Sequence, residues 1–262
     1  MAQTKRILLI AGEVTPFAEI SELADLIRHL PESLADHGDF EARVTMPRYG
    51  TINERSNRLH EVIRLSGTDI SMGDAEETLT VKVASIPDTR VQVYFMDHDD
   101  YFGRAAVAHD DNGAAFADNA ERALFYNRSV LETISNLRWG PDVIHAFGWV
   151  GALAPLLLNT EYAANETLNG ARVVYTPDHL DTETHLTADF ADRMDIQLNG
   201  ASEDIPLSTL GKRQAHAVIH ASADHASAQT ANGEASVFPA NRADRGKVLV
   251  DLYDDLLREV PA

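Results

Sequence analysis

Residues 5–11 read Lys5-Arg-Ile-Leu-Leu-Ile-Ala11, and this stretch decides the fold. A continuous apolar run that begins with charged residues is typical of a strand buried on both faces of a parallel sheet. After Pro16, apolar residues recur at three- and four-residue spacing from Leu23 to Leu34, which predicts a helix that ends at Gly38. Phe40 to Met46 is typical of a second strand, so the N-terminal segment predicts a right-handed βαβ unit.

The alternation of strands and helices continues along the chain. Two runs at 79–84 and 91–96, separated by a turn, predict an antiparallel hairpin. Further strands are predicted at 143–147, 172–176 and 217–221, and further helices at 118–137, 149–162, 207–215 and 246–260. The sequence therefore predicts an α/β fold, with a Rossmann-like, open, mostly parallel sheet flanked by helices and an antiparallel hairpin insertion.

The charge balance excludes several classes of partner. The chain of 262 residues carries 41 acidic and 22 basic residues, a net charge of −19, and it stays negative even if all 11 histidines are protonated. Such a chain repels phosphate backbones and anionic lipids, so we expect no nucleic-acid or membrane partner. It has no cysteine, and we read no transmembrane span or signal peptide in it. We expect a cytoplasmic protein.

The acidic residues are spread over the whole chain, and only four of the basic residues are lysines. This acidic surface is typical of a halophilic protein in a high-salt cytoplasm, where salt screens self-repulsion. Attraction of cations or of a basic partner is the alternative, and the sequence leaves both open.

The loop after the first strand lacks both common phosphate-binding patterns. Residues 12–22 contain neither GxGxxG nor GxxxxGK[ST], and Glu19 and Glu22 put two carboxylates where a diphosphate would lie. Acids near a helix start also stabilise the helix dipole without any ligand. The chain has no GxSxG motif and no close pair of carboxylates that stands out, so nothing supports nucleophilic hydrolysis.

Four potential metal ligands alternate in one polar segment: His179, Asp181, Glu183 and His185. In an extended segment they would project to one side, but the spacing matches no standard zinc site and equally fits a solvated loop. We predict no metal and no cofactor. His145 lies near the end of a buried strand, where it is either a binding residue or a satisfied core histidine.

With these segments in place, the chain resembles the N-terminal half of bacterial glycogen synthase and plant starch synthase, which have a two-domain GT-B fold. The matching stretches are Ile7–Ala18, Leu23–Asp25, Leu30–Pro31, Met46–Gly50, Asp97–His98, Tyr101–Phe102, Arg104, Phe116–Arg122 and Trp139–His145. Their order and spacing agree over about residues 5–225, which makes the resemblance specific.

The chain departs from the family at three polar positions. The family has KTGG in the first loop, and its lysine is taken to contact the donor phosphates; residues 19–22 here are Glu-Ile-Ser-Glu. Gly148 stands where the family has the acid of its Asp-Trp-His segment. Asp178 stands where the family has a histidine beside the transferred glucose, unless His179 replaces it from the next position.

The resemblance also has consequences for domain organisation. GT-B enzymes bind most of the donor nucleotide in a second domain, and the family's chains are about twice as long as this one. We expect residues 1–262 to form one N-terminal-type domain, with 246–262 as a C-terminal amphipathic helix that is a candidate cover for the former inter-domain surface. Without the second domain's basic residues, we expect no glucosyl transfer from ADP-glucose by this chain alone.

The expected function is that of a pseudoenzyme: a binding, regulatory or scaffold protein in α-glucan metabolism, with an α-glucan or sugar as ligand and no catalytic residue assigned. The alternative is a working glucosyltransferase completed by a separate C-terminal partner, and self-association is a further expectation. Residues retained from the family are the candidate ligand-binding set: Asp25, Tyr49, Asp118, Asn119, Arg122, His145 and His179. Asp118 and Asn119 also fit helix caps, and Arg122 also fits an ion-pair partner within the domain.

Overall fold

A computed structural model describes residues 4–178, 184–198, 204–222 and 236–258. The strands are β1 Lys5–Ile10, β2 Phe40–Pro47, β3 His60–Glu61, β4 Thr68–Met72, β5 Ala75–Ser85, β6 Gln92–Asp97, β7 Val143–Phe147, β8 Arg172–Thr176, β9 His185–Leu186, β10 Ile205–Pro206, β11 Ala217–His220 and β12 Ser236–Val237. The helices are α1 Leu23–His37, α2 Asp99–Phe102, α3 Asn119–Asn136, α4 Gly148–Gly151, α5 Ala154–Asn159, α6 Ala188–Arg193, α7 Leu207–Gln214 and α9 Arg242–Arg258.

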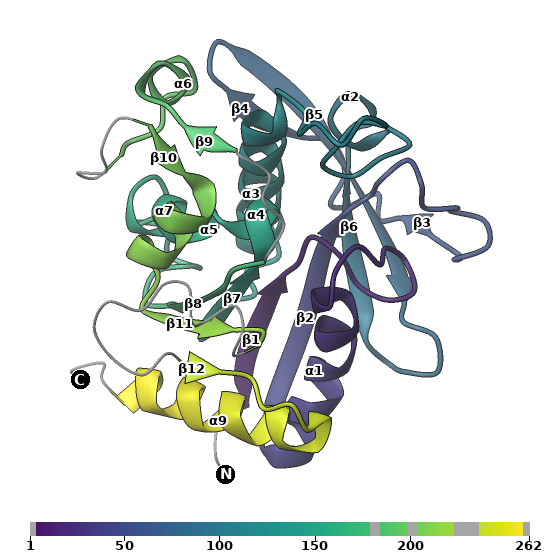
Figure 1. Cartoon of the computed structure of the whole chain (residues 1–262), viewed down its shortest axis with the longest axis vertical. Helices are drawn as coiled ribbons and strands as arrows, with labels where there is room; N and C mark the ends of the chain where they lie inside the picture. Colours follow the sequence, from purple (N-terminus) through teal and green to yellow (C-terminus); the bar gives the residue numbers. More distant parts are fainter. Residues whose placement is uncertain (1–3, 179–183, 199–203, 223–235, 259–262) are drawn as a thin grey trace.

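Most of the described strands form one mixed sheet (Figure 1). Its order is β12-β11-β8-β7-β1-β2-β6-β5-β3, with β4 paired to β5. The strands from β12 to β6 are parallel, whereas β5 runs antiparallel to β6, β3 and β4. The predicted mostly parallel sheet and its antiparallel hairpin are therefore confirmed. β9 and β10 form a separate antiparallel pair.

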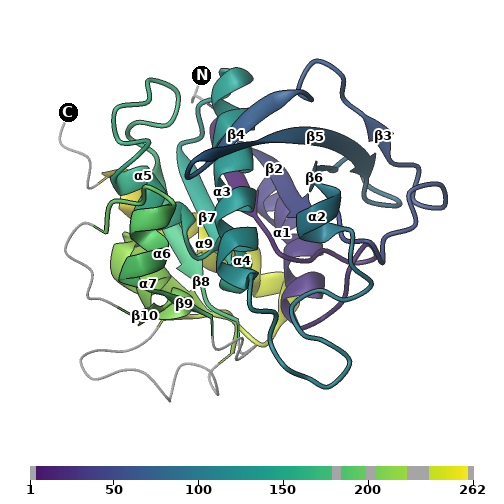
Figure 2. The ribbon, with the colours of Figure 1, turned by 90° about the horizontal axis from the view of Figure 1, so that it is seen from above.

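The first strand lies at the centre of this sheet. Residues 7–11 are fully buried, because helices cover both faces: α3, α4, α5 and α7 lie on one side and α1 and α9 on the other (Figure 2). The chain leaves β1 through α1 to reach β2, and later passes through α3 to reach β7 on the opposite side of β1. The sheet therefore has a topological switch point between β1 and β7.

Two helices differ from their sequence predictions. The single helix predicted at 149–162 is instead two short helices, α4 and α5, because Pro155 cannot continue a helix from the preceding turn and occupies the first turn of α5. The C-terminal helix begins at Arg242, four residues before its predicted start, and is described as far as Arg258.

The C-terminal helix α9 is tied to the first part of the chain. Lys5 Nζ lies 2.5 Å from the Asp254 carboxylate, and Arg242 pairs with Asp25 of α1. Gly246 is buried where α9 meets α1, and a β carbon there would lie 2.5 Å from the backbone oxygen of Ser33. The close approach of the two helices thus depends on a residue without a side chain.

Replacing Gly246 by alanine should force α9 away from α1 and lower the free energy of unfolding by about 1–3 kcal/mol. Urea unfolding would measure this loss, and hydrogen exchange would locate it in α9. Lys247→Ala, at an exposed position one residue later, is the matched control. Equal stabilities of the two variants would contradict the proposed role of Gly246.

Candidate functional site

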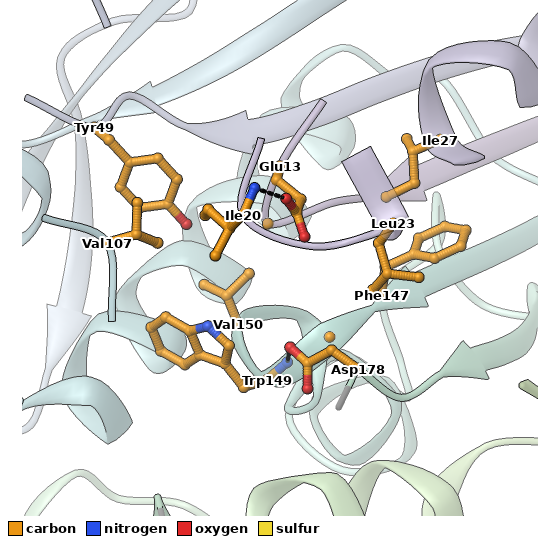
Figure 3. A pocket seen from close by; sticks show the side chains of 12 residues that line it. Glu13, Ile20, Leu23, Ile27, Tyr49, Val107, Phe147, Trp149, Val150 and Asp178 are labelled. Atoms are coloured by element: carbon orange, nitrogen blue, oxygen red, sulfur yellow. Dashed lines mark hydrogen bonds between the residues drawn. The ribbon is translucent and has the colours of Figure 1, made fainter. Parts of the chain in front are cut away.

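A pocket lies at the switch point, at the carboxyl ends of the central strands (Figure 3). It encloses about 280 Å³, counting its open mouth. The lining residues are Gly12, Glu13, Ile20, Leu23, Ile27, Tyr49, Val107, Phe147, Gly148, Trp149, Val150 and Asp178. Open α/β sheets bind their ligands at this position, so the pocket is the candidate functional site.

Glu13 holds the loop between β1 and α1 in place. Its buried carboxylate accepts hydrogen bonds from the backbone N–H groups of Ile20, at 2.5 Å, and of Ser21, at 2.8 Å, and from the Ser21 hydroxyl. Backbone N–H groups just before a helix are the groups that bind anions in many α/β proteins. Here a carboxylate of the chain itself occupies them.

Asp178 lies across the pocket from Glu13. The backbone N–H of Trp149, in α4, donates to its Oδ2 at 2.9 Å. Gly148 has φ +66°, and a β carbon there would lie 2.7 Å from the same oxygen, so a side chain at position 148 would be strained and would displace this carboxyl group. Burial, together with the nearby charge of Glu13, raises the pKa of Asp178 to about 7.

Two aromatic residues complete the pocket. The fully buried Tyr49 directs its hydroxyl group into it, and that oxygen has no hydrogen-bond partner among the described residues (Figure 3). Burial raises the pKa of Tyr49 well above its ordinary value. Trp149 forms another wall, with the Arg122 guanidinium 5.7 Å from its ring centroid.

The lining therefore carries two carboxyl groups, and the described residues that form it include no lysine, arginine or histidine. Glu19 and Glu22, predicted to put acids at a diphosphate position, are exposed and do not line the pocket. Glu22 is the N-cap residue of α1, as the sequence placed it, whereas the acids that line the pocket are Glu13 and Asp178. Arg28 supplies no compensating charge to the loop, since its guanidinium binds the Pro87 carbonyl at 3.1 Å.

Tyr49 is one predicted ligand-binding residue that lines the pocket. Asp25 is exposed on α1 and pairs with Arg242 of α9. Asp118 precedes α3, where its carboxylate pairs with Arg104 and makes no capping hydrogen bond. These two acids thus connect segments of the domain.

Asn119 and Arg122 are buried on α3, where they hold the segment before that helix. Asn119 Nδ2 donates to the Ala108 carbonyl at 2.9 Å. Arg122 Nε donates to the Tyr101 carbonyl and its Nη1 to the Val107 carbonyl, both at 2.6 Å, and Nη1 also donates to Asn119 Oδ1. Because Val107 lines the pocket, Arg122 supports one wall from behind.

His145 is fully buried in β7 and faces α9. Its Nδ1 lies 2.7 Å from the Tyr253 hydroxyl, and its Nε2 lies 2.8 Å from the Thr176 hydroxyl. Burial lowers the pKa of His145 to about 3, so the ring is neutral near neutral pH. The ring links the sheet to the C-terminal helix.

The predicted metal-ligand segment lies mainly outside the described residues, which include neither His179 nor Asp181 nor Glu183. His185 Nδ1 lies 2.5 Å from the exposed Asp204 carboxylate. The described part of the chain contains no group of three or more histidine or acidic side chains arranged to hold a metal ion. It also contains no helix with the length and apolar character needed to cross a membrane.

Sequence reasoning missed the roles of Glu13 and Asp178. Glu13 belongs to the Ile7–Ala18 stretch that matched the family, but its partners are backbone groups that no sequence motif reports. Asp178 was recognised only as a replacement for the family's histidine. The signal available was an acid two or three residues after the end of each of two buried strands, β1 and β8.

Comparison with known proteins assigns this architecture to a family. The family model of the starch synthase catalytic domain matches residues 6–231. The chain belongs to that family. Glycogen synthase from Chlorobium limicola is 44% identical over 172 residues, which are 65% of this chain and 35% of that protein. Glycogen synthase from Pelodictyon phaeoclathratiforme is 41% identical over 172 residues, again 65% of this chain and 35% of that protein.

The starch synthase family also contains a solved structure with the same fold. The catalytic domain of starch synthase IV from Arabidopsis thaliana, bound to ADP and acarbose, covers 97% of this chain with a TM-score of 0.72 and 17% sequence identity. The predicted resemblance and the predicted GT-B-type, Rossmann-like fold are confirmed. The chain spans about a third of the length of the curated relatives and half of the solved chain.

Proposed function

We propose that this starch synthase family domain binds α-glucan but does not by itself transfer glucose from ADP-glucose, and that it acts as a binding, regulatory or scaffold protein in α-glucan metabolism. One observation carries the proposal: the switch-point pocket presents Glu13 and Asp178 and, among the described residues, no cation. The donor of this family carries a diphosphate, which needs positive charge or free N–H groups.

The two acids would repel a diphosphate strongly. A pair of like unit charges at about 4 Å repels by roughly 4 kcal/mol in an effective dielectric near 20, before screening by salt. The N–H groups of Ile20 and Ser21 could offset this for a phosphate, but Glu13 occupies them. The repulsion between like charges and the loss of these N–H groups to Glu13 both oppose the binding of a diphosphate in this pocket.

A neutral sugar avoids that repulsion. The solved starch synthase IV domain is bound to ADP and acarbose, and only the sugar part of that pair suits the pocket of this chain. Ile20, at the pocket mouth, is 38% exposed and offers an apolar surface to the C–H face of a sugar ring. The hydroxyl groups of a glucan would hydrogen bond to the carboxyl groups of Glu13 and Asp178, which lie below Ile20 in the pocket.

Calorimetric titration of the whole chain with maltoheptaose and, separately, with ADP-glucose tests the proposal. We expect maltoheptaose to bind and ADP-glucose to give no heat of binding at millimolar concentration. Micromolar binding of ADP-glucose would need about −8 kcal/mol from an acidic site and would contradict the proposal. Donor binding that appears only after a separate C-terminal half is added would favour the transferase completed by a partner.

A matched pair of variants tests where the glucan binds. Ile20→Ser should weaken maltoheptaose binding several-fold, because it removes apolar surface at the pocket mouth. Ile63→Ser removes an isoleucine that is 82% exposed and does not line the pocket, so it should leave the affinity unchanged. If both variants bind as well as the unmodified chain, the glucan does not use this mouth.

A further inference from the structure

The two carboxyl groups of the pocket face each other across its interior (Figure 3). Glu13 is fixed by the loop it holds, and Asp178 is fixed by the Trp149 N–H, so neither can turn away without losing hydrogen bonds. Arg122 lies behind Trp149 and its charge acts on the Tyr49 hydroxyl, but its hydrogen bonds are made to the Tyr101 and Val107 carbonyls and to Asn119 rather than to either acid. No side chain among the described lining residues brings a positive charge between the two acids.

Tyr49 supplies an independent sign of a ligand. Its hydroxyl group is fully buried and points into the same space, yet it has no hydrogen-bond partner within the described part of the chain. Buried polar groups in folded proteins nearly always have a partner, so an unpaired one at a pocket wall indicates a group that binds there. A hydroxyl oxygen can accept a hydrogen bond or coordinate a cation.

The size of the interior limits what fits between these groups. Below the mouth the pocket has room for about one water-sized group. A divalent ion such as calcium takes six to eight oxygen ligands, which is more than three side chains supply. A single small positive charge suits two carboxylates, one hydroxyl oxygen and the neighbouring indole of Trp149.

We propose that this pocket binds one small monovalent cation, either an ammonium group or an alkali-metal ion, between Glu13 and Asp178 and against the Tyr49 hydroxyl. The salts that test the cation site contain no sugar, so the result does not depend on whether the pocket binds glucan. A cation bound here would offset part of the negative charge on which the proposed exclusion of the diphosphate rests.

Thermal unfolding of the whole chain at constant pH and ionic strength tests the site. Chloride salts of potassium, ammonium and methylammonium are compared with tetramethylammonium chloride, whose cation is too large for the interior. At about ten times the dissociation constant, a bound cation should raise Tm by about 2–4 °C relative to tetramethylammonium. A rise with the two ammonium ions alone assigns an amine ligand, and a rise that includes potassium assigns a general small-cation site.

Variants of the pocket residues, with a charge-matched control, decide whether the pocket causes the rise in Tm. Asp178→Asn keeps an oxygen for the Trp149 N–H and removes one charge, so it should abolish the rise, and Tyr49→Phe should reduce it. Glu19→Gln removes one charge at an exposed position that does not line the pocket and should retain the full rise. Equal Tm values of the unmodified chain in all four salts, or a full rise in the Asp178→Asn variant, would overturn the proposal.

Discussion

Replacing Arg122 by methionine is expected to lower the free energy of unfolding by about 3–5 kcal/mol. Methionine fills much of the same space but leaves the Tyr101 and Val107 carbonyls and the Asn119 side chain without their donor in a buried environment. The ring faces of Phe102, Phe116 and Trp149 also lose the guanidinium that lies 5.5–5.7 Å from their centroids. Urea unfolding followed by circular dichroism would measure the loss.

Arg104→Met is the matched control for this experiment. Arg104 is about one-third exposed and pairs with Asp118, so its loss should cost no more than about 1 kcal/mol. If the two variants are destabilised equally, the buried hydrogen bonds of Arg122 do not carry the energy assigned to them.

Acidification should destabilise the protein through His145. Its pKa is about 3 in the folded chain against an ordinary value of 6.5, so between these values the unfolded state binds a proton that the folded state does not. The contribution of His145 is therefore fully present above about pH 6.5 and decreases as the pH falls toward 3. Between pH 7 and pH 5 this residue should cost about 2 kcal/mol of stability.

His145→Gln isolates this effect, because glutamine can hydrogen bond but does not titrate. The difference in unfolding free energy between pH 7 and pH 5 should be smaller in this variant by about 2 kcal/mol. His60→Gln, at an exposed position on β3, controls for the loss of an imidazole. An unchanged pH dependence in His145→Gln would show that burial of His145 does not set the acid sensitivity.

The fold was predictable where the burial of an element requires apolar residues that are consecutive in the sequence. Residues 7–10 of β1 and all of β7 are buried, so both strands are rich in apolar residues, with His145 as the one polar residue of β7, and can be recognised without their neighbours. β4 was not predicted, because residues 68–72 form a strand through pairing with β5 rather than through an apolar run. The break between α4 and α5 was missed because apolar residues follow one another there whether the segment is one helix or two.

The site was less predictable than the fold. The resemblance pointed to Tyr49, but polarity alone did not show that Arg122 faces the domain interior, because the sequence does not say which side of α3 is covered. Glu13 and Asp178 follow different strands and meet only through the order of β1, β7 and β8. Their opposition across one pocket depends on contacts between distant parts of the chain.

The contact between Gly148 and Asp178 constrains how this domain can evolve. A side chain at position 148 would collide with the Asp178 carboxyl group at 2.7 Å and would also have to adopt a left-handed backbone conformation. A side chain at position 148 would therefore require the Asp178 carboxyl group, the free end of a flexible side chain, to move away. An acid at position 148 would also bring a second negative charge beside Asp178, so we expect substitutions at these two positions to have non-additive effects on stability.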